Sequence, residues 1–409
     1  MNLLTYVVRE GDTSRRIAMN FGVSHAALRA ANPQWLEGES PVPGELVHVP
    51  ARLPRRYVCR TGDTIASVAM FCGCSAERLR ACNPELGEDE PEAGQQLELP
   101  AGRADTIVHT SAEYGPDQLA KDLIRIKRSF PFVSVDSIGR SVLGKPIHAL
   151  RIGEGPFRWH FNGSCHANEW ITSLLLMKFA EDYARACRRR GALGGQNAAS
   201  LFRKTSLWIV PMLNPDGAEL AQTGLFASHP YYSELLAMNR GSARFHRWKA
   251  NVHGVDLNDQ FPAGWEEEKA RRSVAGPGPR DYGGPSPLSE PEARAIAEFT
   301  ERMDFHAVLS LHSQGEEIYW NYRDEEPPES ERWANRLANA SGYNAVKLSG
   351  SDAGYKDWFI HAFRRPGFTV EVGWGRNPLP LDAFSEIYDD VVKLLTEALA
   401  LAGDETVHE

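Results

Sequence analysis

The sequence lacks any long hydrophobic run. Its apolar stretches fall well short of the roughly 20 residues that a membrane-spanning helix needs. Residues 1–4 lead directly into the segment 6–13, and the apolar core and cleavage site of a secretory signal are missing. These absences predict a cytoplasmic chain that has no membrane partner.

Basic runs and cysteines are also scarce. The net charge is −9 and the longest basic run is residues 188–190, which argues against nucleic acid as a partner. Six cysteines in 409 residues fit a reducing compartment better than a disulfide framework. Four of them gather at Cys59, Cys72, Cys74 and Cys82. We expect free buried thiols there, because the C-x-x-C spacing of a metal or redox site is missing.

What the sequence does contain is a repeat. Residues 6–13 recur as residues 57–64, and Asn32-Pro33 recurs at the same shift as Asn83-Pro84. Each copy is typical of a strand, a Gly-Asp turn, an amphipathic helix, a short second helix and a closing strand. The sequence therefore predicts two copies of one small unit.

These units resemble LysM domains, which bind glycans that contain N-acetylglucosamine. The resemblance implies that the glycan lies between the turn after the first strand and the loop after the Asn-Pro pair. The alternative is that the repeats only pack against the rest of the chain. The implied residues are Gly11, Asp12, Thr13 and Asn32 in the first copy, and Gly62, Asp63, Thr64 and Asn83 in the second.

The larger part of the chain carries a spacing typical of a hydrolytic zinc site. His166 and Glu169 lie three residues apart, between an apolar strand and an apolar helical run. Such a zinc ion takes three protein ligands and keeps one position open for water, so His312 would complete the set. Glu371, a carboxylate in an otherwise apolar strand, would be the general base. The alternatives are a chance H-x-x-E match and a salt-bridged structural glutamate.

From about Tyr114 onward the chain resembles the zinc carboxypeptidase family of the carboxypeptidase A and B type. The resemblance implies an α/β fold with a mixed, twisted, mostly parallel sheet and helices on both faces. It also implies one zinc ion on His166, Glu169 and His312, with Glu371 as the general base. The blocks that carry it are residues 137–147, 166–169, 214–217, 254–258, 289–292, 312–313 and 369–371.

Two positions depart from the exopeptidases of that family. Asp259 follows Asn258 where those enzymes have an arginine that grips the C-terminal carboxylate of the substrate. A carboxylate repels a carboxylate, which argues against simple C-terminal trimming. The position of the substrate-capping tyrosine falls on Ile360. Residues 259–265 and 373–378 resemble instead the γ-D-glutamyl-diaminopimelate endopeptidase branch, which cuts the stem peptides of bacterial peptidoglycan.

We therefore predict a zinc metallopeptidase that cuts the γ-D-glutamyl bond to meso-diaminopimelate (or lysine), with the LysM units holding the glycan. In this hypothesis Asp259 meets an ammonium of the stem peptide, beside Asn258. Arg376 or Lys249 meets a carboxylate, and Lys249 or Arg247 steadies the oxyanion. The alternatives are an ordinary metallocarboxypeptidase and a peptidoglycan-binding protein whose peptidase domain is inert.

The expected domains are LysM units at residues 1–50 and 51–100, a linker at 101–112 and a catalytic domain at 113–402. A cell-wall substrate for a chain without a secretory signal would fit release by lysis, action on wall fragments, or a sporulating mother cell.

Overall fold

The computed structural model describes residues 3–8, 12–21, 23, 25–33, 35, 41–50, 56–59, 62–72, 76–87, 89–99 and 106–402. The chain divides into two compact units, Met1–Tyr114 and Gly115–Glu409. None of the helices in these described residues is both long enough and apolar enough to cross a bilayer.

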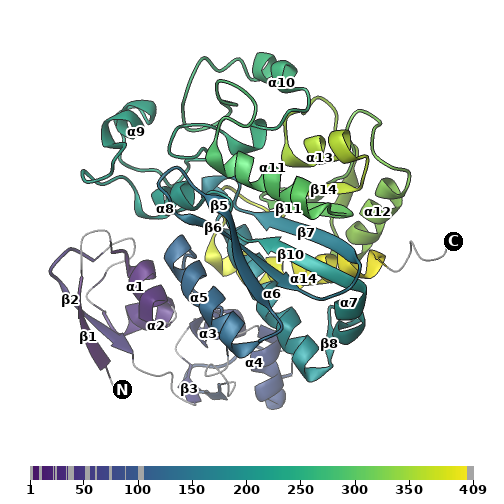
Figure 1. The fold of residues 1–409 in the computed structure, drawn as a ribbon. Coiled ribbons are helices and arrows are strands. Elements are labelled where there is room, and N and C mark those ends of the chain that lie inside the picture. Colours follow the sequence, from purple (N-terminus) through teal and green to yellow (C-terminus); the bar gives the residue numbers. More distant parts are fainter. Residues whose placement is uncertain are drawn as a thin grey trace. The chain divides into compact units, whose positions relative to one another are not determined.

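The first unit holds the two repeats, and each has the predicted order of strand, helix, helix and strand (Figure 1). The elements of the first are β1 (Leu3–Val7), α1 (Ser14–Phe21), α2 (His25–Ala30) and β2 (Leu46–Pro50). Those of the second are β3 (Arg56–Val58), α3 (Ile65–Cys72), α4 (Ala76–Cys82), the 3₁₀ turn η1 (Pro84–Leu86) and β4 (Gln96–Glu98). In each repeat the two strands pair antiparallel. Separate apolar cores form around Ile17 and Leu28 and around Val68 and Leu79, so both repeats follow one plan.

The second unit is built on an eight-stranded sheet. Its strands are β5 (Ser134–Arg140), β6 (Pro146–Ile152), β7 (Phe157–Gly163), β10 (Thr205–Val210), β11 (Ala307–His312), β12 (Glu317–Tyr319), β13 (Asn344–Val346) and β14 (Gly367–Glu371). The order across the sheet is β13-β12-β14-β11-β7-β10-β6-β5. The central strands β14, β11, β7 and β10 are parallel, whereas β6 and β5 on one side and β12 on the other join antiparallel. β8 (Ala192–Leu193) and β9 (Gln196–Asn197) form a separate hairpin.

Helices cover both faces of this sheet (Figure 1). Their bounds are α5 (Pro116–Ser129), α6 (Ile171–Arg189), α7 (Ala198–Lys204), α8 (Pro215–Thr223), α9 (Tyr232–Met238), α10 (Trp265–Arg272), α11 (Pro291–Met303), α12 (Glu329–Ser341), α13 (Tyr355–Phe363) and α14 (Phe384–Leu401). Short 3₁₀ turns lie at η3 (Ala167–Glu169), η4 (Leu257–Asp259) and η5 (Leu381–Ala383).

The side chains of β7 alternate between two cores. Trp159 lies with its ring centroid 6.0 Å from that of Trp333 in α12, and its neighbour His160 lies 5.6 Å from Phe299 in α11. Successive residues of a strand point to opposite faces, so α12 and α11 cover opposite faces of the sheet. A mixed, mostly parallel sheet with helices on both faces is the fold that the resemblance implied, and that prediction is confirmed.

The carboxyl ends of three neighbouring parallel strands meet at one edge of the sheet. β7, β11 and β14 lie side by side, and in the register His312 of β11 pairs with Glu371 of β14. This edge is where open α/β sheets place their ligands.

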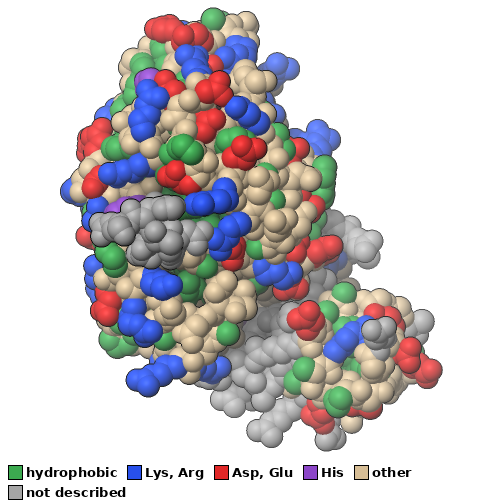
Figure 2. Space-filling model, turned by 90° about the vertical axis from the view of Figure 1, so that its right-hand side faces the viewer, with side chains coloured by type: hydrophobic (Ala, Val, Ile, Leu, Met, Phe, Trp, Pro, Cys, Tyr) green, Lys and Arg blue, Asp and Glu red, His purple; other side chains and the backbone are tan. Residues whose placement is uncertain are grey.

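The view in Figure 2 shows acidic and basic side chains interspersed over the larger, coloured part of the molecule. Over the described residues on that face, no broad field of one sign stands out.

Candidate metal centre and active site

His166 and Glu169 are brought together by the short connection from β7 to α6. β7 ends at Gly163, where a Cβ atom would lie 2.9 Å from the hydroxyl of Thr172, so only glycine lets α6 begin this close. The amide nitrogen of Ser164 donates to the same hydroxyl at 2.7 Å, and that hydroxyl donates to the carbonyl oxygen of Glu169 at 2.8 Å. The connection is thus tied to the first turn of α6.

Two other parts of the chain hold this connection. The Nδ2 atom of Asn214 lies 3.2 Å from the carbonyl oxygens of both Cys165 and Ala250. The amide nitrogen of Ala167 donates to the carbonyl oxygen of Lys249 at 2.9 Å. The Asn-Pro-Asp-Gly block therefore supports the turn between His166 and Glu169 and places the segment around Lys249 against it.

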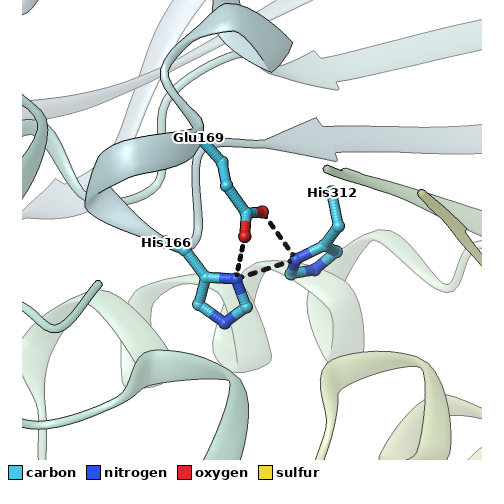
Figure 3. Close-up of side chains that lie close together, drawn as sticks. All are labelled: His166, Glu169 and His312. Carbon is cyan, nitrogen blue, oxygen red and sulfur yellow. Dashed lines mark hydrogen bonds and ion pairs between the residues drawn. The ribbon is translucent and has the colours of Figure 1, made fainter. Parts of the chain in front are cut away.

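Three side chains that can each donate to a metal converge at the strand edge (Figure 3). Nδ1 of His166 lies 2.9 Å from Oε1 of Glu169, and Nδ1 of His312 lies 3.1 Å from Oε2. The two Nδ1 atoms are themselves 3.1 Å apart. All three side chains are buried.

This donor set fits a zinc ion. A tetrahedral zinc with bonds of about 2.0–2.1 Å separates its ligand atoms by about 3.3 Å, close to the distances between these three. Two imidazole nitrogens that face each other need either a proton or a metal cation between them, and a zinc ion can be that cation. Burial disfavours charge on Glu169, but His166 and His312 hold its pKa below the ordinary value, so it is the anion that a metal ligand must be.

Asp256 lies behind the metal position and is fully buried. Its Oδ1 is 3.2 Å from Nε2 of His166, which is close enough for an ion pair, but the two groups are not aligned for a hydrogen bond. Its Oδ2 is 3.0 Å from Nζ of Lys249. Burial raises the pKa of Asp256, but Lys249 and His166 outweigh it and hold that pKa well below the usual range. A carboxylate on the far ring nitrogen orients the histidine and fixes its tautomer.

The sequence analysis gave no role to Asp256, although it lies in the quoted block 254–258. It also missed two donors to Glu169: the amide nitrogen of Ser313 at 3.2 Å and Nδ2 of Asn377 at 3.3 Å. Asp256 could have been found from its position two residues before Asn258 in that block. No local sequence pattern predicts the contact of Asn377 with Glu169.

Glu371 ends β14 beside the proposed ligand His312. The amide nitrogen of Val372 donates to the carbonyl oxygen of His312 at 2.9 Å, which fixes the two strand ends together. Burial, assisted by the nearby Glu169 carboxylate, raises the pKa of Glu371 to about 8. A carboxyl group with a raised pKa beside the metal position is suited to general-base work.

Asp259 is not the free anion that the sequence analysis assumed. Its side chain is 4% exposed, and Oδ2 lies 3.2 Å from the Nε atom of Arg272 in α10. Burial and the neighbouring Asp256 raise the pKa of Asp259 to about 7, although Arg272 opposes the shift. An ammonium group of a substrate would have to replace Arg272 to reach this carboxylate. Asn258, next to it, accepts a hydrogen bond from the amide nitrogen of Tyr355 at 3.3 Å.

The three predicted cations differ in how they are held. Lys249 is paired with Asp256, and burial, the largest influence on its pKa, is outweighed by the carboxylates around it, so the pKa lies above the ordinary value. Arg247 is half-buried and Arg376 is exposed. Neither arginine forms an ion pair with the residues that the structure describes. These two are the more available of the three for a substrate carboxylate or an oxyanion.

Ile360 does not lie at a substrate-contacting position. It is fully buried in α13, within the core between that helix and the sheet. The count along the sequence from Asp357 was therefore wrong, because it assigned a residue of the helix interior to the substrate cleft.

In the repeats, the two asparagines are structural. Nδ2 of Asn32 donates to the carbonyl oxygens of Leu28 and His48, and Oδ1 accepts from the amide of His48. Asn83 makes the same three bonds in the second repeat, and both are buried. Their side chains hold the closing strand against the helices, which corrects the prediction that they contact the glycan.

The turns before the first helices stay candidates for glycan contact. Thr13 and Thr64 each cap a helix, accepting at 3.1 Å from the amides of Arg16 and Ser67. Asp12 and Asp63 accept from the tyrosine hydroxyls of the preceding strands. Gly62 has a positive φ of 88°, while Gly11 lies outside the described residues.

Comparisons with known families agree with this construction. The zinc carboxypeptidase family matches residues 120–378, and the LysM domain matches residues 6–50 and 57–100. The chain belongs to the zinc carboxypeptidase family and is a metallopeptidase with two LysM domains at its N-terminal end, as the sequence predicted.

Among its relatives is gamma-D-glutamyl-L-diamino acid endopeptidase 1 of Lysinibacillus sphaericus. It is 44% identical over 295 residues, which are 72% of this chain and 74% of that protein. The uncharacterised protein YqgT of Bacillus subtilis (strain 168) is 41% identical over 309 residues, or 75% of this chain and 81% of that protein.

Solved structures share the fold at low identity. Bovine thrombin-activatable fibrinolysis inhibitor has a TM-score of 0.56 at 18% identity, covering 72% of this chain and 99% of that one. Carboxypeptidase A of Helicoverpa armigera has a TM-score of 0.55 at 18% identity, covering 81% and 80%. At this identity the likeness concerns the fold alone.

Proposed function

We propose that this chain hydrolyses the γ-D-glutamyl bond to meso-diaminopimelate, or to lysine, in peptidoglycan stem peptides, and that its LysM domains bind the glycan. The observation that carries the proposal is the convergence of His166, Glu169 and His312 beside Glu371 at one sheet edge. The 44% identity to a gamma-D-glutamyl-L-diamino acid endopeptidase supports the choice of bond.

His166, Glu169 and His312 would hold the zinc ion, which supplies Lewis acidity toward the scissile carbonyl and lowers the pKa of water. Glu371 then takes the proton of the attacking water at its carboxylate and returns it to the leaving amine.

The oxyanion that forms during attack needs a positive group. Of the two predicted cations, Lys249 is committed to Asp256 at 3.0 Å, so its ammonium also serves to keep that carboxylate charged. Arg247, half-buried and without a described ion pair, is the better candidate for the oxyanion.

The alternative of ordinary C-terminal trimming has less support. Trimming needs a cation that binds the terminal carboxylate. Asp259, at the position where the exopeptidases have an arginine, has a raised pKa but carries no positive charge. Arg272, the nearest cation to it, is shared among the carboxylates of Asp259, Glu268 and Asp281. A guanidinium with three anionic partners has little capacity for a fourth.

The test is mass spectrometry of L-Ala-γ-D-Glu-meso-diaminopimelate incubated with the zinc-loaded full-length protein and with Glu371→Gln. We expect free diaminopimelate from the wild type and a loss of several orders of magnitude in rate for the variant, with zinc content unchanged. Hydrolysis of plain peptides without D-glutamate would favour the carboxypeptidase alternative. Retention on purified peptidoglycan with no cleavage of any muropeptide would favour the inert binder.

A further inference from the structure

Glu169 is the proposed metal ligand whose side chain has the most freedom to turn. The torsion that rotates its carboxylate plane joins an sp³ carbon to an sp² carbon, and such torsions have broad preferences. Glu169 also lies on the short turn η3, whereas His312 ends a strand of the sheet. The plane of this carboxylate is therefore set by the groups around it.

Each oxygen of the carboxylate accepts from one neutral N–H group in addition to facing a histidine (Figure 3). Oε2 faces Nδ1 of His312 and accepts from the amide nitrogen of Ser313 at 3.2 Å. Oε1 faces Nδ1 of His166 and accepts from Nδ2 of Asn377 at 3.3 Å. The first donor belongs to the backbone, so only the second depends on the type of residue that supplies it.

The partners of the Asn377 amide allow it one orientation. Its Nδ2 also donates to the carbonyl oxygen of Ser313, and its Oδ1 accepts from Oγ of Ser313 at 2.8 Å. A flipped amide would set its oxygen against a carbonyl and a carboxylate, two groups that only accept. The contacts therefore fix which atom is the nitrogen, and both of its protons have partners.

Asn377 does not have to hold its own segment in place. It lies in the connection that follows β14, and two other bonds tie this connection to the one that follows β11. The amide nitrogen of Gly315 donates to the carbonyl oxygen of Gly373 at 2.8 Å. The amide nitrogen of Gly375 donates to Oε1 of Gln314 at 3.3 Å. The bond from Asn377 to Glu169 is thus additional to the bonds that fasten the two connections.

A neutral donor suits this place in the metal centre. A lysine or arginine would compete with the zinc ion for the charge of Glu169, and an aspartate would repel that charge. An amide N–H leaves the carboxylate ionised, and it uses only part of the lone-pair capacity of one oxygen. Carboxylates that bind metals are in turn hydrogen-bonded, and loss of such a partner lowers metal affinity.

We propose that Asn377 is a positioning residue of the metal centre, whose amide fixes the plane of the Glu169 carboxylate toward the zinc ion. One side chain thereby links the connections that follow β7, β11 and β14. The inference goes beyond the proposed function, because it concerns the metal centre and does not depend on which peptide bond is cut. The alternative is that Asn377 only fastens its connection to Ser313.

The experiment replaces Asn377 by alanine in the full-length protein. Zinc affinity is measured by competition with a chromophoric chelator, and the visible absorption spectrum is recorded after cobalt(II) has been substituted for zinc. We expect Asn377→Ala to bind zinc about 10- to 100-fold more weakly than the wild type. We also expect the cobalt bands to change, since they depend on how the ligands are arranged around the ion. A residue that only fastened the loop would leave the cobalt bands as they are.

Gln314→Ala is the matched control. It removes a bond between the same two connections, but its side chain is exposed and has no described contact with Glu169. We expect this variant to keep the zinc affinity of the wild type within a few-fold, with the same cobalt spectrum.

Ser313→Ala takes the place of Asn377→Ala if circular dichroism shows that the latter does not fold. It removes the hydroxyl that donates to Oδ1 of Asn377 and leaves the backbone amide on Glu169. We expect zinc binding to weaken about five-fold, the worth of one neutral hydrogen bond, and the cobalt bands to change.

An unchanged cobalt spectrum, or the zinc affinity of the wild type, in a folded Asn377→Ala would overturn the inference. The same result in Ser313→Ala, where that variant replaces it, would do so too. Equal losses in Asn377→Ala and Gln314→Ala would also overturn it, because loosening of the loop would then suffice. None of these results touches the proposed function, which is tested by cleavage of the stem tripeptide by the wild type.

Discussion

Replacing Asp256 by asparagine tests whether the carboxylate behind His166 tunes the metal site. Asp256 has four partners: Nε2 of His166, Nζ of Lys249, and the amide nitrogens of Asn258 and Asp281. Asparagine keeps the shape but loses the charge, and its NH₂ group faces one of those donors without a bond. We expect the fold to persist and the histidine to lose its anionic partner.

The expected loss of zinc affinity is 10- to 100-fold, which corresponds to about 1.4–2.7 kcal/mol. The substitution also lowers the free energy of unfolding, because Asp281 at 3.9 Å is then the one described ion-pair partner that Lys249 keeps. Breaking a buried pair by removing one partner costs about 3–5 kcal/mol, and the 18% exposure of Lys249 points to the lower end. The two effects are measured separately, by competition with a chromophoric chelator and by thermal melting.

Asp281→Asn is the matched control for Asp256→Asn. Asp281 also faces Lys249, and Arg272 lies 3.6 Å from it, but its carboxylate has no described contact with His166. We expect Asp281→Asn to bind zinc within a few-fold of the wild type. Equal losses in both variants, or wild-type affinity in a folded Asp256→Asn, would refute the argument that this carboxylate acts through the histidine.

Three further outcomes are expected. Burial lowers the pKa of His160 to about 3, so as the pH falls the unfolded chain binds a proton at this histidine before the folded chain does. The free energy of unfolding should therefore fall by about 1.4 kcal/mol per pH unit between pH 6.5 and 3. His160→Phe should flatten this pH dependence in thermal melts of the full-length protein. Asn83→Ala should destabilise the second repeat by about 2 kcal/mol or more, seen as faster proteolysis there, because it strips partners from buried backbone groups. Removal of zinc with a chelator should abolish hydrolysis yet leave retention on purified peptidoglycan intact. Loss of hydrolysis and of retention together would place glycan binding outside the repeats.

Features that depend on neighbours along the chain were predicted well. The spacing of His166 and Glu169 at a strand end, and the apolar strands that carry His312 and Glu371, are local patterns, and the structure brings the four residues to one edge. The repeats were likewise visible as self-similarity. The fold was implied by the family resemblance that the sequence blocks carry, and the structure has that fold.

Features that depend on distant partners could not be predicted. Asp259 reads as a free carboxylate in the sequence, because Arg272 reaches it only once α10 has folded over η4. Asn32 reads as a polar loop residue that is free to bind, yet the closing strand covers it. In both cases a polar side chain is satisfied by a group that no local pattern connects to it. The cytoplasmic location and the domain boundaries stay predictions.

The same distinction shows where specificity must lie in this family member. The metal donors come from strand ends that the sheet holds rigidly, and solved structures at 18% identity share that fold. The groups around them come from connections: Asp259 from η4, Arg272 from α10, and Lys356 and Asp357 from the start of α13. Asp259, Lys356 and Asp357 are buried, and all four charges are paired with one another, so one substitution leaves a partner unsatisfied and is costly by itself. Changing the substrate therefore requires replacing several of these residues together, while the zinc chemistry at the strand ends can stay as it is.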